Sequence, residues 1–186
     1  MASALVGGKL LETIAETGKK LGNTGDVLKG LRKFVDNPFD ELGKLKKNIQ
    51  YKTGEFGHLG ETDELGRLES MASDNLQLTE REKRLIHDGD TPGKLSGDHA
   101  GHLIADRFGG SPEIDNLISQ LGSVNLSEYK KIENEWARAL SEVPPLKVEI
   151  KIKVLYEGKD IRPSSFEVSY KIDGRTLPIK KISNNK

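Results

Sequence analysis

The segment SGDHAGHLIADRFGG, residues 96–110, holds two of the four histidines of the chain, His99 and His102. An ordinary histidine pKa of about 6.5 lets a neutral imidazole accept a proton or bind a metal ion near pH 7. Three interpretations of the segment are open: a pair of metal ligands, a general base beside an uninvolved neighbour, or two polar residues at a strand end. Gly101 leaves the approach to His102 open, and HLIA predicts a short strand beginning at His102 that fixes its ring.

Two oxygen-bearing side chains, Asn125 and Glu133, lie on a downstream segment that predicts a helix over residues 125–142. They are eight residues apart, which places them about 80° apart around a helix axis. Such oxygen ligands suit a hard cation, and a histidine on a preceding strand would complete a metal site with a general base. A plainer interpretation makes Asn125 a helix N-cap and Glu133 a solvated residue. The apolar stripe of the predicted helix comprises Tyr129, Ile132, Trp136 and Leu140.

The composition excludes several classes of protein. The chain has 186 residues, 34% of them hydrophobic and 31% charged, which suits one domain with an appendage. The lack of cysteine excludes disulfides and thiolate metal sites. No apolar run reaches the roughly 18 residues needed to span a bilayer. The N-terminus lacks a basic region followed by a continuous apolar stretch, so we expect neither a membrane span nor a signal peptide.

The net charge is zero, but the charges are unevenly distributed. Residues 51–145 contain ten basic and eighteen acidic residues, whereas residues 147–186 contain ten basic and five acidic ones. An acidic middle can hold a divalent cation, and a basic C-terminal part can lie along a phosphate backbone. Clustered but solvated surface charge is the plainer alternative.

The remaining elements predict an α+β fold in two parts. Residues 1–50 form short amphipathic helices, one of which includes Phe34 and Val35, and we expect a helical linker or docking segment there. Residues 51–186 form the folded domain, with short strands around the turn in TDELGRLES and a short capped helix beginning at Thr79. Alternating residues at 148–156 and 166–172 predict two half-buried strands, and the dipeptide DG at 173–174 a hairpin turn into a third.

Four segments occur in a specific order and spacing: AGHLIADRFGG, DNLISQ, VNLSEYKKIENEWARAL and RPSSFEVSYKIDG. Together they resemble the DNA/RNA non-specific endonuclease family of the ββα-metal (His-Me finger) superfamily. Within it they are most similar to the bacterial polymorphic-toxin branch, found at the C-terminus of large secreted antibacterial proteins. The resemblance covers roughly residues 51–182 and implies a ββα-metal nuclease core with a C-terminal β-hairpin region, preceded by a helical pre-toxin segment.

The resemblance also implies roles for individual residues. His102 matches the general base that activates water for attack on phosphorus. Asn125 matches the direct Mg²⁺ ligand, and Glu133 a residue that holds metal-bound water. Asn116 and Gln120 match an N-x-x-x-Q pattern before the helix, which implies a supporting role.

One departure from the family pattern concerns the position two residues before the histidine. Better-known relatives carry an arginine there, whereas this chain has Ala100. Arg67 and Arg107 are therefore candidates for the cation that meets transition-state charge, although either could be a solvated structural arginine. Asp98 is expected to support the loop, and His99 is expected not to be a metal ligand.

The leading hypothesis is a Mg²⁺-dependent endonuclease, in which Mn²⁺ can substitute, that cleaves DNA, with RNA as an alternative main substrate. The resemblance implies a toxin module neutralised by an immunity protein, exported within a larger toxin by a dedicated system and acting in the target-cell cytoplasm. A non-catalytic nucleic-acid-binding module would instead show salt-sensitive binding without cleavage. A zinc hydrolase using His99 and His102 is disfavoured, because residues three apart on an extended segment point to different faces.

Overall fold

The computed structural model describes residues 32–185, and the chain from Phe34 onward forms one compact unit. The helices predicted for residues 1–31 lie outside the described residues. Residues 32–50 contain no helix, and strand β1 lies at Lys33–Phe34, so the helix predicted through Phe34 and Val35 is wrong at those positions. The Val35 amide donates instead to the Gln50 carbonyl at 2.9 Å, an extended pairing that replaces a helical turn. The predicted boundary at residue 51, between a helical linker or docking segment and the nuclease domain, stays a prediction.

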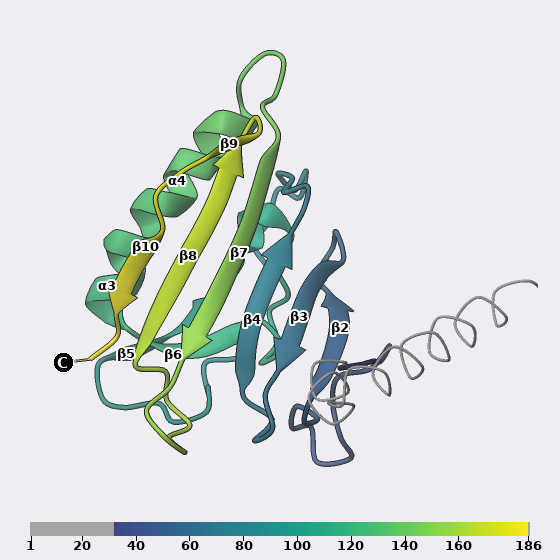
Figure 1. Cartoon of the computed structure of the whole chain (residues 1–186), viewed down its shortest axis with the longest axis vertical. Helices are drawn as coiled ribbons and strands as arrows, with labels where there is room; N and C mark the ends of the chain where they lie inside the picture. The colour runs from purple at the N-terminus through teal and green to yellow at the C-terminus, as the bar shows by residue number, and fades with distance from the viewer. Residues whose placement is uncertain (1–31, 186) are drawn as a thin grey trace, which may run out of the picture. The chain divides into compact units, whose positions relative to one another are not determined.

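The largest element is an eight-stranded sheet in the order β1-β2-β3-β4-β7-β8-β10, with β9 paired to β8 (Figure 1). The pairs from β2 to β10 are antiparallel. The turn in TDELGRLES joins β3 to β4, as predicted. The strands are β2 (Ile49–Thr53), β3 (His58–Thr62), β4 (Leu68–Ser73), β7 (Val148–Leu155), β8 (Ser165–Ile172), β9 (Arg175–Thr176) and β10 (Lys180–Ser183).

The C-terminal strands confirm the alternation of the sequence. Every second residue of β7, from Val148 to Val154, is buried, and the residues between them are partly or fully exposed. Asp173 and Gly174, with φ of 49° and 76°, make the turn from β8 to β9. Two successive residues at positive φ suit the twist of a hairpin, and aspartate and glycine tolerate that region best.

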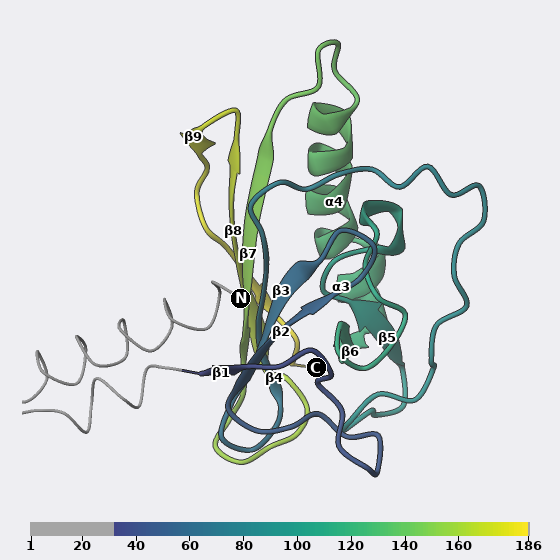
Figure 2. The same cartoon turned by 90° about the vertical axis from the view of Figure 1, so that its right-hand side faces the viewer.

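Helix α4 (Glu128–Leu140) covers one face of this sheet (Figures 1 and 2). Its predicted stripe faces the core: the Trp136 ring lies 5.7 Å from that of Tyr170, and the Tyr129 ring 6.2 Å from that of Phe166. Aromatic residues bury roughly 150–250 Å² each, so these contacts fix α4 firmly on the sheet. The single helix predicted from residue 125 is wrong in one respect. Helix α3 (Gly122–Leu126) is separate, because Ser127, with φ of −123° and ψ of −77°, interrupts the helical backbone.

A second, two-stranded sheet lies on the same side as α4 and consists of β5 (Asp98–His102) and β6 (Leu117–Leu121) (Figure 2). A short 3-10 helix, η1 (Asp106–Phe108), lies between the two strands in sequence. The strand predicted to begin at His102 instead ends there, because the backbone bends at Leu103 and Ile104. The order β5-β6-α3-α4 places the end of one strand next to a helix.

The segment between β4 and β5, residues 74–97, has no helix or strand and arches over the side that carries α4 (Figure 2). The short helix predicted from Thr79 is therefore wrong. The Thr79 hydroxyl accepts the Arg81 amide at 3.2 Å and donates to Glu55 at 2.8 Å, so it serves a loop contact rather than a helix cap. The predicted α+β class is confirmed. Among residues 32–185, no helix is both long enough and apolar enough to cross a bilayer.

Candidate active site

His102 is the last residue of β5 and lies opposite Leu117 of β6. The turn that follows is fixed by Asn116, whose side-chain oxygen accepts the Ile104 amide at 2.9 Å. Its side-chain nitrogen donates to the carbonyls of Ile104 and Ser111, both at 2.9 Å. These bonds give Asn116 contacts that suit its predicted supporting role.

The face of β5 opposite His102 packs against Gln120, the other residue of the N-x-x-x-Q pattern. A Cβ atom on Gly101 would lie 2.2 Å from Gln120 Oε1, so the glycine lets the Gln120 side chain approach the strand this closely. Gln120 is fully buried, and neither of its amide atoms has a hydrogen-bond partner among residues 32–185. Gln120 therefore fills the space behind the histidine strand.

Three predicted site residues converge on one cleft of about 380 Å³. His102 comes from β5, Asn125 from α3 and Glu133 from α4, so the fold brings together residues that are up to 31 positions apart. The further lining residues are Arg84, Ala100, Ala105, Asp106, Arg107, Leu126 and Lys130.

Burial shifts the pKa values of the two titratable residues in opposite directions. Burial, together with the charges of His87 and Arg84, lowers the pKa of His102 to about 4. Burial also raises the pKa of Glu133 to about 7, although Arg107, Arg84 and Lys130 oppose that rise. At pH 7 His102 is therefore neutral and able to accept a proton, and a cation near Glu133 would favour its carboxylate form.

The oxygen donors of the cleft fit a hard, largely hydrated cation. Asn125 Nδ2 lies 3.4 Å from His99 Nδ1, so the amide oxygen of Asn125 is the side-chain atom that could bind a cation. The Glu133 side chain is only 17% exposed and supplies the carboxylate. Within residues 32–185, no three His, Cys, Asp or Glu side chains gather in a metal-binding cluster, so His99 and His102 have no third such partner there. An amide and one carboxylate leave most coordination positions to water, as Mg²⁺ favours.

The sequence profile of the DNA/RNA non-specific endonuclease family matches residues 47–174. The chain belongs to the DNA/RNA non-specific endonuclease family. It is thus an endonuclease, a phosphodiester hydrolase acting on nucleic acid, and the resemblance seen in the sequence motifs is confirmed. The matched range contains the whole cleft.

Other known proteins are similar to this endonuclease over part of their length. Type VII secretion system protein EssD of Staphylococcus aureus (strain USA300) is 39% identical over 149 residues, which cover 76% of this chain and 24% of that protein. The chain thus spans about a quarter of the length of this relative. A structure of Sda1 nuclease with bound zinc ion is 27% identical over 48% of this chain and 40% of its own, with a TM-score of 0.45. A second structure, of an extracellular nuclease, is 16% identical over 73% and 85%, with a TM-score of 0.44.

The two predicted arginines lie in different places. Arg67 does not line the cleft: its Nε lies 2.6 Å from Asp63 Oδ2, and its Nη1 donates to the carbonyls of Gly158 and Asp160. These contacts give Arg67 structural partners outside the cleft, and its predicted role as a cation of the reaction stays a prediction. Arg107 does line the cleft, but its Nη2 donates to Asn134 at 3.0 Å and lies 3.9 Å from Glu133.

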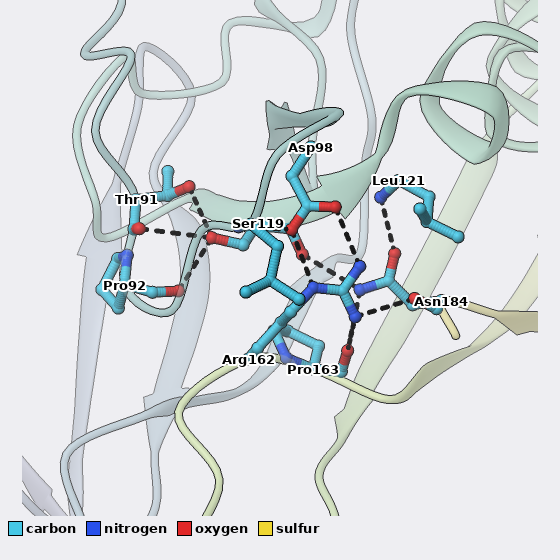
Figure 3. A network of polar contacts seen from close by, with 9 residues as sticks. Thr91, Pro92, Asp98, Ser119, Leu121, Arg162, Pro163 and Asn184 are labelled. Carbon is cyan, nitrogen blue, oxygen red and sulfur yellow. Dashed lines mark hydrogen bonds and ion pairs between the residues drawn. The ribbon is translucent and has the colours of Figure 1, made fainter. Parts of the chain in front are cut away.

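Asp98 lies at the opposite end of β5 from His102. Its carboxylate accepts two bonds from Arg162, at 2.7 and 3.0 Å, and the Leu95 amide at 3.0 Å. Arg162 also donates to the Asn184 carbonyl at 2.8 Å (Figure 3). Asp98 therefore anchors the start of the histidine strand, away from the cleft.

Three further residues lie around His102 that were not predicted from the sequence as part of the site. Arg84 and Lys130 line the cleft, and the His87 ring packs edge-on against His102 with centroids 5.1 Å apart. Arg84 and His87 lie in the segment 74–97, where the sequence pattern favoured a short helix from Thr79 but the structure has neither helix nor strand. A loop of more than twenty residues is uncommon in a compact domain and is often functional.

Proposed function

We propose that this endonuclease is Mg²⁺-dependent, belongs to the ββα-metal type and cleaves DNA with little sequence preference. The observation that supports the proposal is the convergence of His102, Asn125 and Glu133 on one cleft. Three residues are brought together there from three separate elements, β5, α3 and α4. A non-catalytic binding module would need no such convergence.

His102 is the general base in this proposal. Its low pKa keeps the imidazole neutral, so a ring nitrogen takes a proton from water as the water oxygen bonds to phosphorus. The bond from phosphorus to the leaving ester oxygen then breaks, and that oxygen takes a proton from solvent. His102 Nε2 is buried without a hydrogen-bond partner, an arrangement that costs about 1–3 kcal/mol and leaves the ring uncommitted to any structural bond.

Asn125 would hold the Mg²⁺ directly by its amide oxygen, and Glu133 would hold it through water. The bound ion supplies positive charge against the negative charge that develops on the phosphate. Mn²⁺ accepts the same oxygen ligands and is expected to substitute.

The direct experiment is incubation of the purified chain with plasmid DNA and with total RNA. We expect degradation of plasmid in Mg²⁺ or Mn²⁺ and none after chelation. Cleavage that continues in chelator would contradict the metal dependence, and degradation of RNA alone would contradict the DNA preference. RNA remains a second candidate substrate, because attack by water on phosphorus needs no 2′-hydroxyl.

We also propose that the chain acts as an antibacterial toxin module, delivered within a larger secreted protein and blocked by an immunity protein. Its similarity to a quarter of the type VII secretion system protein EssD supports export as part of a larger protein. Expression of the wild type in bacterial cytoplasm should then reduce viability and degrade DNA, whereas His102→Ala should be tolerated. Equal viability of the two strains, with both proteins present in soluble form, would contradict the proposal.

A further inference from the structure

The segment that arches over the cleft is held in place on both sides of Arg84. Arg81 forms ion pairs with Glu55 at 2.8 Å and with Asp106 at 3.0 Å. The backbone amide of Leu85 donates to the same Asp106 carboxylate at 3.1 Å. Because Asp106 belongs to η1, four residues after His102, these contacts attach the segment to the turn that follows the histidine. Arg84 is thus carried by docked backbone rather than by a free loop.

Arg84 differs from Arg107, the other arginine of the cleft, in its contacts with the described part of the chain. Arg84 is exposed and lines the cleft, and it makes no hydrogen bond or ion pair with any of residues 32–185. Arg107, in contrast, bonds to Asn134 and lies near Glu133. The guanidinium of Arg84 is therefore available to a ligand in the cleft.

Arg84 borders the space between the predicted base and the predicted metal-binding residues. Arg84, His102 and Glu133 line the same cleft, and the charge of Arg84 is among the causes, after burial, that lower the pKa of His102. Lys130 also lines the cleft, but an ammonium is a point charge, whereas a guanidinium can bond two oxygens of one phosphate.

We propose that Arg84 binds the non-bridging oxygens of the phosphate being cleaved and stabilises the negative charge that they gain in the transition state. This inference rests on the proposed nuclease function. Fixed donors aimed at developing charge lower a barrier more than they tighten ground-state binding. Arg84 therefore acts mainly on the rate of cleavage at saturating substrate.

The test compares Arg84→Ala with Lys83→Ala, a control one residue away on the same exposed segment that does not line the cleft. Single-turnover cleavage of plasmid is measured in Mg²⁺ at saturating protein, and binding of a labelled duplex by fluorescence anisotropy in chelator. We expect Arg84→Ala to slow cleavage about 100-fold or more with little change in binding. Lys83→Ala should stay within about threefold of the wild type. Arg84→Lys should recover part of the rate, and millimolar guanidinium should partly rescue Arg84→Ala but not His102→Ala.

Three outcomes would overturn the inference. Arg84→Ala could cleave as fast as Lys83→Ala, or it could lose binding while its rate at saturation stays that of the wild type. A wild type that does not cleave in Mg²⁺ would contradict the proposed function, and the inference would fall with it. If the wild type cleaves in Mg²⁺ and Arg84→Ala cleaves at the same rate, only the inference about Arg84 is contradicted, and the proposed function stands. Thermal unfolding should be the same for the wild type and Arg84→Ala, because Arg84 has no hydrogen bond or ion pair with residues 32–185 to lose.

Discussion

The two ends of strand β5 differ in the hydrogen bonding of their buried polar groups. At the first end, the buried Asp98 carboxylate is paired with Arg162, and the buried Asn184 amide bonds to three backbone groups (Figure 3). At the other end, His102 Nε2 is buried without a hydrogen-bond partner among residues 32–185, and so is Arg107 Nε. One strand thus joins a hydrogen-bonded anchor at Asp98 to a cleft in which His102 Nε2 has no such bond within residues 32–185. Gln120, behind the strand, is also buried without a partner there.

The bonded Asp98 end is suited to a structural role, whereas the His102 end is suited to the role proposed for it in catalysis. Most buried polar atoms in folded proteins are hydrogen-bonded, because an unpartnered one loses its hydration without compensation. Gly93 illustrates the close packing at the anchor, since an added Cβ there would lie 2.8 Å from the Arg162 amide nitrogen. In the cleft, His102 Nε2 lacks such a bond with any of residues 32–185, which suits its proposed role as a base.

Removing the anchor carboxylate should have the largest effect on stability. In Asp98→Ala the Arg162 guanidinium, 14% exposed, keeps its charge but loses its counter-ion. Breaking a buried pair in this way costs about 3–5 kcal/mol, and we expect that loss in the free energy of unfolding measured with urea. The control is Lys181→Ala, which removes an exposed ion pair with Glu167 and should cost less than about 1 kcal/mol. Equal losses in the two variants would contradict an anchoring role for Asp98.

The cleft should respond to pH with two effects of opposite sign in the protein without metal. The pKa of Glu133 is about 7 in the folded state against 4.5 ordinarily, so acidification from pH 7 to 4.5 protonates the folded state first and raises stability. The pKa of His102 is about 4 against 6.5, so acidification from pH 6.5 to 4 protonates the unfolded state first and lowers stability. Each effect is on the order of 3 kcal/mol.

Single substitutions separate these two effects. Relative to the wild type in chelator, Glu133→Gln should lose more stability between pH 7 and 4.5, whereas His102→Ala should lose less between pH 6.5 and 4. Urea unfolding at several pH values measures both slopes. If both variants followed the wild-type curve of stability against pH, burial would not shift the pKa values of His102 and Glu133 in the directions given above.

The C-terminal end of the anchor should have an intermediate effect. Asn184 accepts the Leu121 amide at 2.8 Å and donates to the carbonyls of Ser119 at 3.0 Å and Pro163 at 2.7 Å. Asn184→Ala leaves these groups partly unsatisfied and should destabilise the fold by about 1–3 kcal/mol. The neighbouring Asn185→Ala, at an exposed residue, should change stability by less than about 0.5 kcal/mol. Similar melting temperatures for the two variants would show that the Asn184 bonds do not stabilise the fold.

The smallest expected effect on cleavage is that of Arg67. Because Arg67 pairs with Asp63 and lies over the Tyr156 ring at 4.2 Å, away from the cleft, Arg67→Ala should lower stability without slowing cleavage. The rate is measured at a temperature where the variant is fully folded. A loss of about 100-fold in rate would restore Arg67 as a cation of the reaction.

The parts of the fold that depend on local pattern were predictable from sequence. The alternation of β7 and β8 and the stripe of α4 follow from residue spacing, so the helix that carries Glu133 was placed correctly. The break at Ser127 was not predicted, because the sequence there has no proline or glycine to mark it. Asn125 nevertheless lies in the cleft, since α3 follows directly from β6.

The residues that the sequence missed or misplaced depend on non-local contacts. Arg84 reaches the cleft because Arg81 binds Asp106, which is 25 positions away and in no repeating pattern with it. Arg67 was correctly placed in a turn, but its carbonyl partners at 158 and 160 are more than 90 positions distant. Such pairings depend on the assembled fold and leave no periodic signal in the sequence.

The central claim is that His102 is held unpartnered for chemistry rather than for stability. The most direct measurement pairs the cleavage rate of His102→Ala in Mg²⁺ with its free energy of unfolding at pH 7. We predict that the cleavage rate falls by about 10²- to 10⁴-fold, the usual contribution of a general base. The free energy of unfolding should stay the same or rise, since alanine leaves no buried polar atom unpaired. Cleavage within threefold of the wild type, or a rate that falls only because the protein unfolds, would contradict the claim.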